Sequence, residues 1–200
     1  MGEALSVLDD AVAALERGGV IVLPTDTVYG LAARADLTDA VRRITTLKRR
    51  PDDKAFQVLI PSGAWLDRLA EPTDAARRLA DRFWPGPLTI VVAAGAEAPR
   101  ATVADGTIGL RVPAQPLALE IIERSGPLAA SSANRAGEAT PSAIDGVRAS
   151  FGDGVDVYVD GGEVAGVAST VVDVSGPAPV ILREGAISAA VLDAAVRGSI

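Results

Sequence analysis

Thr25, Asp26 and Thr27 follow directly after the apolar run 20–23 and Pro24. A continuous apolar run predicts a strand covered on both faces, and ligands of α/β sheets tend to bind beyond the carboxyl ends of such strands. Hydroxyl groups at that place can accept a hydrogen bond from an ammonium or donate one to a carboxylate. The same residue types are also good helix caps, so the spacing alone leaves a purely structural role open.

Basic side chains gather near residue 50. Lys48 and Arg50 lie at the end of a helix predicted over 38–49, and Lys54 follows shortly after. Pro51 disfavours helix at the residue before it, so we expect the chain to change direction there. Arginine binds phosphate or carboxylate with two parallel hydrogen bonds, and lysine supplies a compact charge. Cations are also favourable at helix C-termini, so the structural alternative stays open.

Two further segments place polar groups beside predicted strands. Thr107 and Arg111 are four residues apart around the strand predicted over 108–112, so their side chains face the same way. An arginine in an apolar strand needs a partner, which is either an acidic side chain or a ligand carboxylate. Ser132 and Asn134 follow the strand predicted over 128–130; they indicate a polar site or an ordinary turn.

The sequence contains no cysteine and no histidine. This excludes disulfides, thiol nucleophiles, thiolate metal sites, Ser-His-Asp and Cys-His catalysis, and the HExxH zinc motif. Any catalysis must use lysine, arginine, carboxylates, hydroxyls, backbone amides, or a metal bound through carboxylates or phosphates. Such an inventory fits phosphoryl or nucleotidyl transfer, in which positioning and charge do most of the work.

The charge is unevenly distributed along the chain. The net charge is −7, from 19 basic and 26 acidic residues, which is unfavourable for non-specific nucleic-acid binding. Residues 34–54, however, hold seven basic and four acidic residues. A basic segment in an acidic protein suggests a small anionic ligand, and a solvated helix face is the other interpretation.

The coarse pattern predicts one α/β (α+β) domain over 1–200 with a mixed, twisted sheet, because helices and strands do not strictly alternate. Helices are predicted over 3–17, 38–49, 73–83, 116–124, 142–150 and 188–197, with caps at Thr38, Thr73, Ser142 and Ser188. Strands are predicted over 20–23, 56–60, 88–92, 108–112, 128–130, 155–159, 170–174 and 180–182. We expect no targeting or membrane-spanning segment and a cytoplasmic location.

Seven motifs occur together in one order: P-T-D-T-V-Y-G-L, K-R-R-P, W-P-G-P-L-T, T-x-x-x-R-V-P, S-x-N-R-x-G, S-T-V-V-D and I-L-R-x-G-A-I-S. In this order the sequence resembles the YrdC-like family of threonylcarbamoyl-adenylate synthases over about 19–188. The resemblance implies an open domain with a concave, positively charged site and no additional C-terminal domain. It implies condensation of L-threonine, bicarbonate and ATP, with Mg²⁺, to threonylcarbamoyl-adenylate and pyrophosphate. A partner complex would then modify an adenosine of tRNA, and a weak tRNA contact by this chain is a further expectation.

The resemblance also implies roles for individual residues. It assigns catalysis to Lys48, Arg50, Ser132 and Asn134. It assigns L-threonine binding to Thr25, Thr27, Arg111, Ala130 and Ser169. It assigns ATP binding to Arg50, Lys54, Thr107, Ser132, Thr140 and Arg183. No protein side chain is assigned to the metal, because Mg²⁺ is readily held by phosphate oxygens and water.

Four places depart from the family pattern: Ala55, Gln115, Ser131 and the stretch 140–142, which reads T-P-S. Ala55 stands where the family has proline, and we expect it to loosen the loop that covers ATP. Two other functions stay open at this point, a related carbamoyl-adenylate-forming enzyme and a non-catalytic module that binds tRNA or double-stranded RNA. The net charge of −7 and the 4% aromatic content argue against the RNA-binding module, because base stacking and a broad positive field are both scarce.

Overall fold

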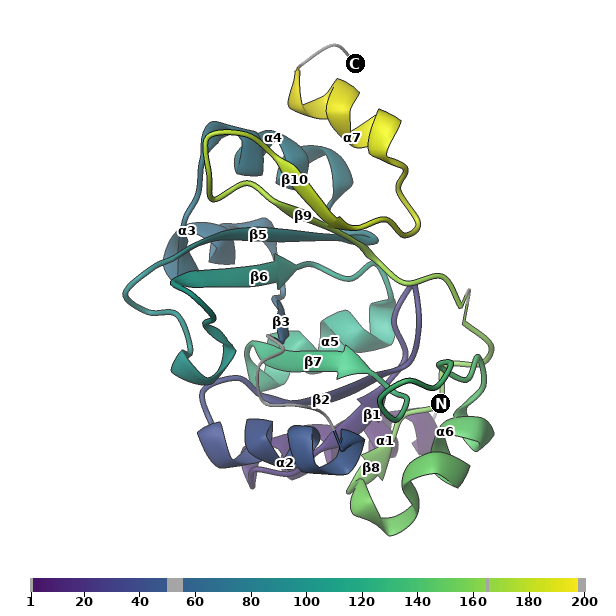
Figure 1. Ribbon diagram of the computed structural model, residues 1–200. Helices are drawn as coiled ribbons and strands as arrows, with labels where there is room; N and C mark the ends of the chain where they lie inside the picture. The colour runs from purple at the N-terminus through teal and green to yellow at the C-terminus, as the bar shows by residue number, and fades with distance from the viewer. Residues whose placement is uncertain (1, 50–55, 165, 198–200) are drawn as a thin grey trace.

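The apolar runs of the chain pair into one mixed sheet in the computed structural model, which describes residues 2–49, 56–164 and 166–197 (Figure 1). Its strands are β1 (Ile21–Leu23), β2 (Gly30–Arg34), β3 (Gln57–Leu59), β4 (Ala70–Glu71), β5 (Leu88–Ala94), β6 (Thr107–Arg111), β7 (Leu128–Ser132), β8 (Val157–Tyr158), β9 (Thr170–Asp173) and β10 (Val180–Arg183). They lie in the order β10-β9-β5-β6-β3-β7-β2-β1-β8, with β4 paired to β5. The pairs β1–β8, β3–β6 and β5–β9 are parallel and the others antiparallel. The predicted α/β fold with a mixed sheet is confirmed.

Helices cover much of this sheet. They are α1 (Gly2–Glu16), α2 (Thr38–Lys48), α3 (Leu66–Leu69), α4 (Asp74–Phe83), α5 (Pro116–Ser125), α6 (Ile144–Phe151) and α7 (Ala189–Val196), with 3-10 turns η1 (Gly63–Trp65), η2 (Arg100–Thr102) and η3 (Gly152–Gly154). No helix among the described residues is long and apolar enough to cross a membrane.

Alternation along the strands divides the interior into two apolar clusters. Ile21 of β1 packs in one cluster with Leu15 of α1 and Ile122 of α5. Its neighbour Val22 packs in the other with Ile44 of α2. Successive strand residues point to opposite faces of a sheet, so an uninterrupted apolar strand can serve both clusters. The helices α4 and α7 add to the second cluster through Leu79 and Leu192, on the part of the sheet that contains β5 and β9 (Figure 1).

The helix caps follow the sequence only in part. Thr73 caps α4, because its hydroxyl accepts a hydrogen bond of 3.2 Å from the Ala76 amide. The predicted caps at Thr38 and Ser142 are wrong: the cap positions belong to the residues just before α2 and α6, whose side chains are apolar. Ser188 holds the cap position of α7 without a side-chain cap bond. Gln115 is the cap of α5, where its side-chain oxygen accepts from the first amides of that helix.

The strand β2 is absent from the sequence prediction. It carries the sequence G-L-A-A-R and lies between β1 and β7, antiparallel to both. The polar residues 25–27 therefore form the connection between two strands, and the alternative that they cap a helix is wrong. The short segment η1–α3–β4 is also absent from the prediction.

Candidate active site

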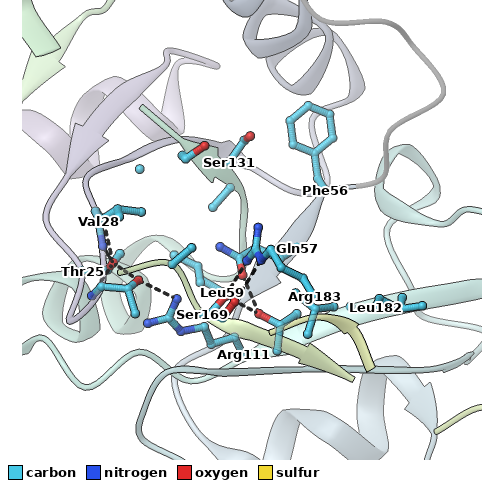
Figure 2. Close-up of a pocket in the computed structure, with 18 of the residues that line it drawn as sticks. Thr25, Val28, Phe56, Gln57, Leu59, Arg111, Ser131, Ser169, Leu182 and Arg183 are labelled. Atoms are coloured by element: carbon cyan, nitrogen blue, oxygen red, sulfur yellow. Dashed lines mark hydrogen bonds between the residues drawn. The ribbon is translucent and has the colours of Figure 1, made fainter. Parts of the chain in front are cut away.

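A cavity of about 790 Å³ opens on the face of the sheet formed by β3, β5, β6, β7, β9 and β10 (Figure 2). Alternation explains which side chains reach it. Thr107, Gly109 and Arg111 of β6 line the cavity, whereas Ile108 and Leu110 between them belong to the apolar core. The spacing of Thr107 and Arg111 predicted that these two side chains face the same way, and the lining of the cavity confirms it.

Arg111 is the largest polar side chain buried in the wall of the cavity, with 1% of its surface exposed. Its Nη2 donates to Asp26 Oδ1 at 2.7 Å, its Nη1 to Thr27 Oγ1 at 3.0 Å and its Nε to the Gly86 carbonyl at 3.0 Å. Burial lowers the pKa of Arg111, and the adjacent Asp26 carboxylate acts in the opposite direction. The sequence left an acidic partner or a ligand carboxylate open for Arg111, and Asp26 is an acidic partner.

The turn before β2 is fixed by the Thr25 hydroxyl. This group donates to the Val28 carbonyl at 2.6 Å and accepts from the Thr27 and Val28 amides at 3.2 Å each. The hydroxyls of Thr25 and Thr27 lie 2.9 Å apart. Because Thr25 donates to Val28, the Thr27 hydroxyl is the donor in that pair when both bonds form. The turn therefore places the ordered Thr27 hydroxyl against Arg111, and the Thr25 hydroxyl is bonded to that of Thr27.

A second arginine, Arg183 of β10, anchors a chain of polar side chains across the cavity floor. It donates from Nε to the Ser169 carbonyl and from Nη2 to Ser169 Oγ, both at 3.0 Å. Ser169 Oγ lies 3.1 Å from Thr89 Oγ1, which donates to Gln57 Oε1 at 2.8 Å. Partial burial lowers the pKa of Arg183, and its charge also lowers the pKa of Arg111. A bound anion near both side chains would be attracted by both charges.

The loop after β7 closes another side of the cavity. Ser132 and Thr140 line it, and the hydroxyls of both donate to Asn134 Oδ1. Lys48, at the end of α2 and 4% exposed, donates from its ammonium to the carbonyls of Ser132 and Asn134. The Ala136 amide donates to the Lys48 carbonyl at 3.1 Å. In this structure Lys48 thus holds the loop that carries Ser132.

The structure brings most of the residues assigned by resemblance to this one cavity. Its lining includes Thr25, Thr27, Thr107, Arg111, Ala130, Ser132, Thr140, Ser169 and Arg183. Lys48 and Asn134 support the loop of Ser132, as described above. Arg50, Lys54 and Ala55 lie outside the described residues. Ser131, at one of the departures from the family pattern, also lines the cavity (Figure 2).

Sequence reasoning assigned no role to three residues that organise the cavity: Asp26, Gln57 and Thr89. A sequence feature could have identified Asp26 as part of the site, because it lies inside a polar triplet after a strand. Gln57 and Thr89 could have been identified too, since each is a polar residue within an otherwise apolar predicted strand. The W-P-G-P-L-T motif supplies the Gly86 carbonyl to Arg111.

The chain is similar to known proteins in both sequence and structure. A threonylcarbamoyl-AMP synthase from Bacillus subtilis is 39% identical over 191 residues, which cover 93% of this chain and 55% of that protein. A threonylcarbamoyl-AMP synthase from Coxiella burnetii is 38% identical over 165 residues, covering 80% of this chain and 88% of that protein. The crystal structure of P. abyssi Sua5 complexed with L-threonine superposes with a TM-score of 0.91 at 37% identity, covering 96% of this chain and 57% of that one.

The chain thus spans about half the length of the relatives from B. subtilis and P. abyssi. The model of the Sua5/YciO/YrdC family, described as "Telomere recombination", matches residues 13–185. This match includes every described residue that we have placed in the lining of the cavity. The chain belongs to the Sua5/YciO/YrdC family.

Proposed function

We propose that this chain is a threonylcarbamoyl-AMP synthase, which converts L-threonine, bicarbonate and ATP into L-threonylcarbamoyladenylate and pyrophosphate. The observation that carries the proposal is that one cavity of about 790 Å³ is lined both by residues assigned to L-threonine and by residues assigned to ATP. The names of the relatives from B. subtilis and C. burnetii, and the L-threonine bound to P. abyssi Sua5, support it.

The reaction needs no covalent enzyme intermediate. The neutral amine of L-threonine attacks the carbon of bicarbonate, and water leaves as the carbamate forms. A carbamate oxygen then attacks the α-phosphorus of ATP, the bond from that phosphorus to the bridging oxygen breaks, and pyrophosphate leaves. Such a reaction depends on bringing the two partners into line and on stabilising charge. The chain's lack of cysteine and histidine is compatible with this chemistry.

The cavity offers groups for both partners. We assign the carboxylate of L-threonine to Arg111, and its other polar groups to Thr25, Thr27, Ser169 and the backbone at Ala130. Arg111 is already oriented by Asp26, Thr27 and Gly86, so a ligand meets a guanidinium whose position is fixed. Preorganised charge of this kind stabilises anions more than a mobile side chain does.

The nucleotide is assigned to Thr107, Ser132, Thr140 and Arg183, which line the same cavity. Arg183 supplies a cation, and the hydroxyls supply neutral donors for phosphate or ribose oxygens. We assign Lys48 and Asn134 a positioning role, because they hold the loop of Ser132 through the contacts given above. The assignments of Arg50 and Lys54 to ATP are part of the same proposal.

Mg²⁺ would enter with ATP, because this ion prefers phosphate oxygens and water as ligands. When bound, it neutralises charge on the phosphates. Among the described residues, no group of three or more carboxylates is placed to hold a metal ion. The product is a reactive mixed anhydride, so the partner that we propose is a further enzyme that transfers the threonylcarbamoyl group to tRNA. We place both enzymes in the cytoplasm.

The test is pyrophosphate release by the purified chain with Mg-ATP, with L-threonine and bicarbonate added singly and together. The proposal expects release only when both are present, and a product whose mass equals that of threonylcarbamoyladenylate. Release without L-threonine would contradict it, because that is simple ATP cleavage. ATP binding without any release would favour the RNA-binding module, whose tRNA affinity would then fall steeply with salt.

A further inference from the structure

The middle of β6 holds a glycine, Gly109, at the floor of the cavity. It pairs with Gln57 of β3 and with Val91 of β5. We propose that Gly109 determines whether both substrates fit at once, because its missing side chain leaves the floor open between the amino-acid and nucleotide subsites. The inference rests on the proposed function and adds a residue that was assigned to neither subsite.

The backbone does not require glycine at this position. Gly109 has hydrogen-bonded strand partners on both sides, and it is absent from the residues with left-handed φ values. Glycine in the interior of a strand is unfavourable, since it lacks a side chain to pack and loses more conformational freedom on folding. Such a glycine often marks a place where a ligand comes close to the backbone.

Packing does not require glycine there either. A Cβ placed on Gly109 would lie 3.4 Å from Thr89 Cγ2, 3.6 Å from Val91 Cγ2 and 4.0 Å from Gln57 Cα. These are contacts that a methyl group can make. Gly19 shows the contrast, because a Cβ at that position would lie 2.7 Å from the Ala14 carbonyl oxygen. Steric exclusion by the protein therefore explains Gly19 but not Gly109.

Two reasons for this glycine remain: the Thr89–Gln57 hydrogen bond of 2.8 Å, which crosses β6 on the same face, and the cavity. The melting temperature tests the first, and the binding of the two ligands tests the second. Thr107 and Arg111 lie two positions to either side of Gly109, point to the same face and line the same cavity. Thr107 is assigned to the nucleotide and Arg111 to L-threonine, so Gly109 lies between the two subsites. There the carbamate must approach the α-phosphorus. A branched side chain at this point would prevent the two ligands from binding at the same time by steric overlap, although each ligand alone would keep its own contacts.

The experiment compares wild type with Gly109→Ala, Gly109→Val and the control Ala93→Val. Ala93 pairs with Thr107 but lies outside the lining of the cavity. Calorimetry measures L-threonine binding with and without a saturating non-hydrolysable ATP analogue, and ATP analogue binding alone. For Gly109→Val we expect each ligand alone to bind within about threefold of wild type. In the presence of the analogue, the L-threonine affinity of Gly109→Val should be ~100-fold lower than that of wild type under the same conditions. We expect a smaller fall for Gly109→Ala and none for Ala93→Val.

The melting temperature of Gly109→Val should be unchanged or higher, because valine is favoured in strands. Simultaneous binding of both ligands by Gly109→Val with wild-type affinity would overturn the inference. So would loss of affinity for one ligand alone, or a fall in melting temperature of more than about 5 °C, since Gly109 would then belong to one subsite or to the folding of the strand. If wild type binds both ligands but releases no pyrophosphate, the proposed function fails, and the binding comparison still decides the role of Gly109. If wild type binds neither, both fail.

Discussion

The pair formed by Asp26 and Arg111 should dominate the stability of the cavity wall. The two side chains are 17% and 1% exposed, and the Asp26 carboxylate also accepts from the Ala114 amide at 3.0 Å. Replacing Asp26 with asparagine keeps the shape and an acceptor oxygen but leaves the Arg111 cation buried without its counter-charge. Removing one partner of a buried pair typically costs about 3–5 kcal/mol. Because Asp26 has some contact with solvent, we expect a loss of about 3 kcal/mol.

This loss is measurable without any ligand. In a chain of this length each kcal/mol shifts the melting temperature by about 2–4 °C, so Asp26→Asn should lower it by about 6–12 °C. Arg111→Met should be destabilised by a similar amount, because it leaves the Asp26 carboxylate without its cation. The double variant should lose about 2 kcal/mol less than the sum of the two. Calorimetry or urea unfolding at neutral pH gives these values.

The control is Asp67→Asn, which breaks the exposed pair with Arg77. Exposed pairs contribute little, so its melting temperature should stay close to that of wild type. Two results would contradict the role of Asp26 as the counter-charge of Arg111. One is an Asp26→Asn variant as stable as wild type, and the other is strict additivity in the double variant. Either would mean that Asp26 does not compensate the charge of Arg111.

Three further predictions concern binding and pH. Arg111→Ala, assayed below its melting temperature, should raise the KM for L-threonine by about 10- to 100-fold with little change for ATP; equal effects on both would contradict the assigned carboxylate contact. Lys48→Met should raise the KM for ATP about tenfold, whereas Arg49→Met, at an exposed neighbour, should leave it unchanged; steady-state kinetics separates the two. Burial raises the pKa of Tyr29 above its ordinary value of 10.0, so the folded state retains that proton and loses stability as the pH rises past that value. Tyr29→Phe should lose less stability than wild type between about pH 9 and about pH 11 in urea unfolding, and equal losses would count against this.

Two of the strands that the sequence predicts most directly contain continuous runs of apolar residues. β1 and β5 are rich in valine and isoleucine, the residue types that fit a pleated, buried surface. β2 reads G-L-A-A-R and has no β-branched residue. It is a strand because β1 and β7 pair with it on both sides, and a pairing of distant segments is not visible in local sequence. The mixed character of the sheet follows from the sequence, but the order of its strands does not.

The same limit applies to the cavity. The spacing of Thr107 and Arg111 predicts a shared face because it depends only on the repeat within one strand. Asp26 lies 85 positions from Arg111 in the sequence, and Gln57 reaches Thr89 only because β6 brings β3 and β5 together. Contacts of this kind depend on the order of strands. A motif resemblance supplied the assignments that spacing alone could not.

Polarity within single strands nevertheless contains more information than these assignments used. In β5, Thr89 lies between Leu88 and Ile90, both fully buried in the core. In β6, Thr107 and Arg111 alternate with core residues, and in β3 Gln57 precedes the buried Val58. Every one of these polar residues lies on the sheet face that lines the cavity. A polar residue in an apolar strand thus indicates the part of a sheet face on which a ligand can bind. By the same rule, a glycine at such a position, as at Gly109, indicates where no side chain can project into the cavity without displacing a ligand.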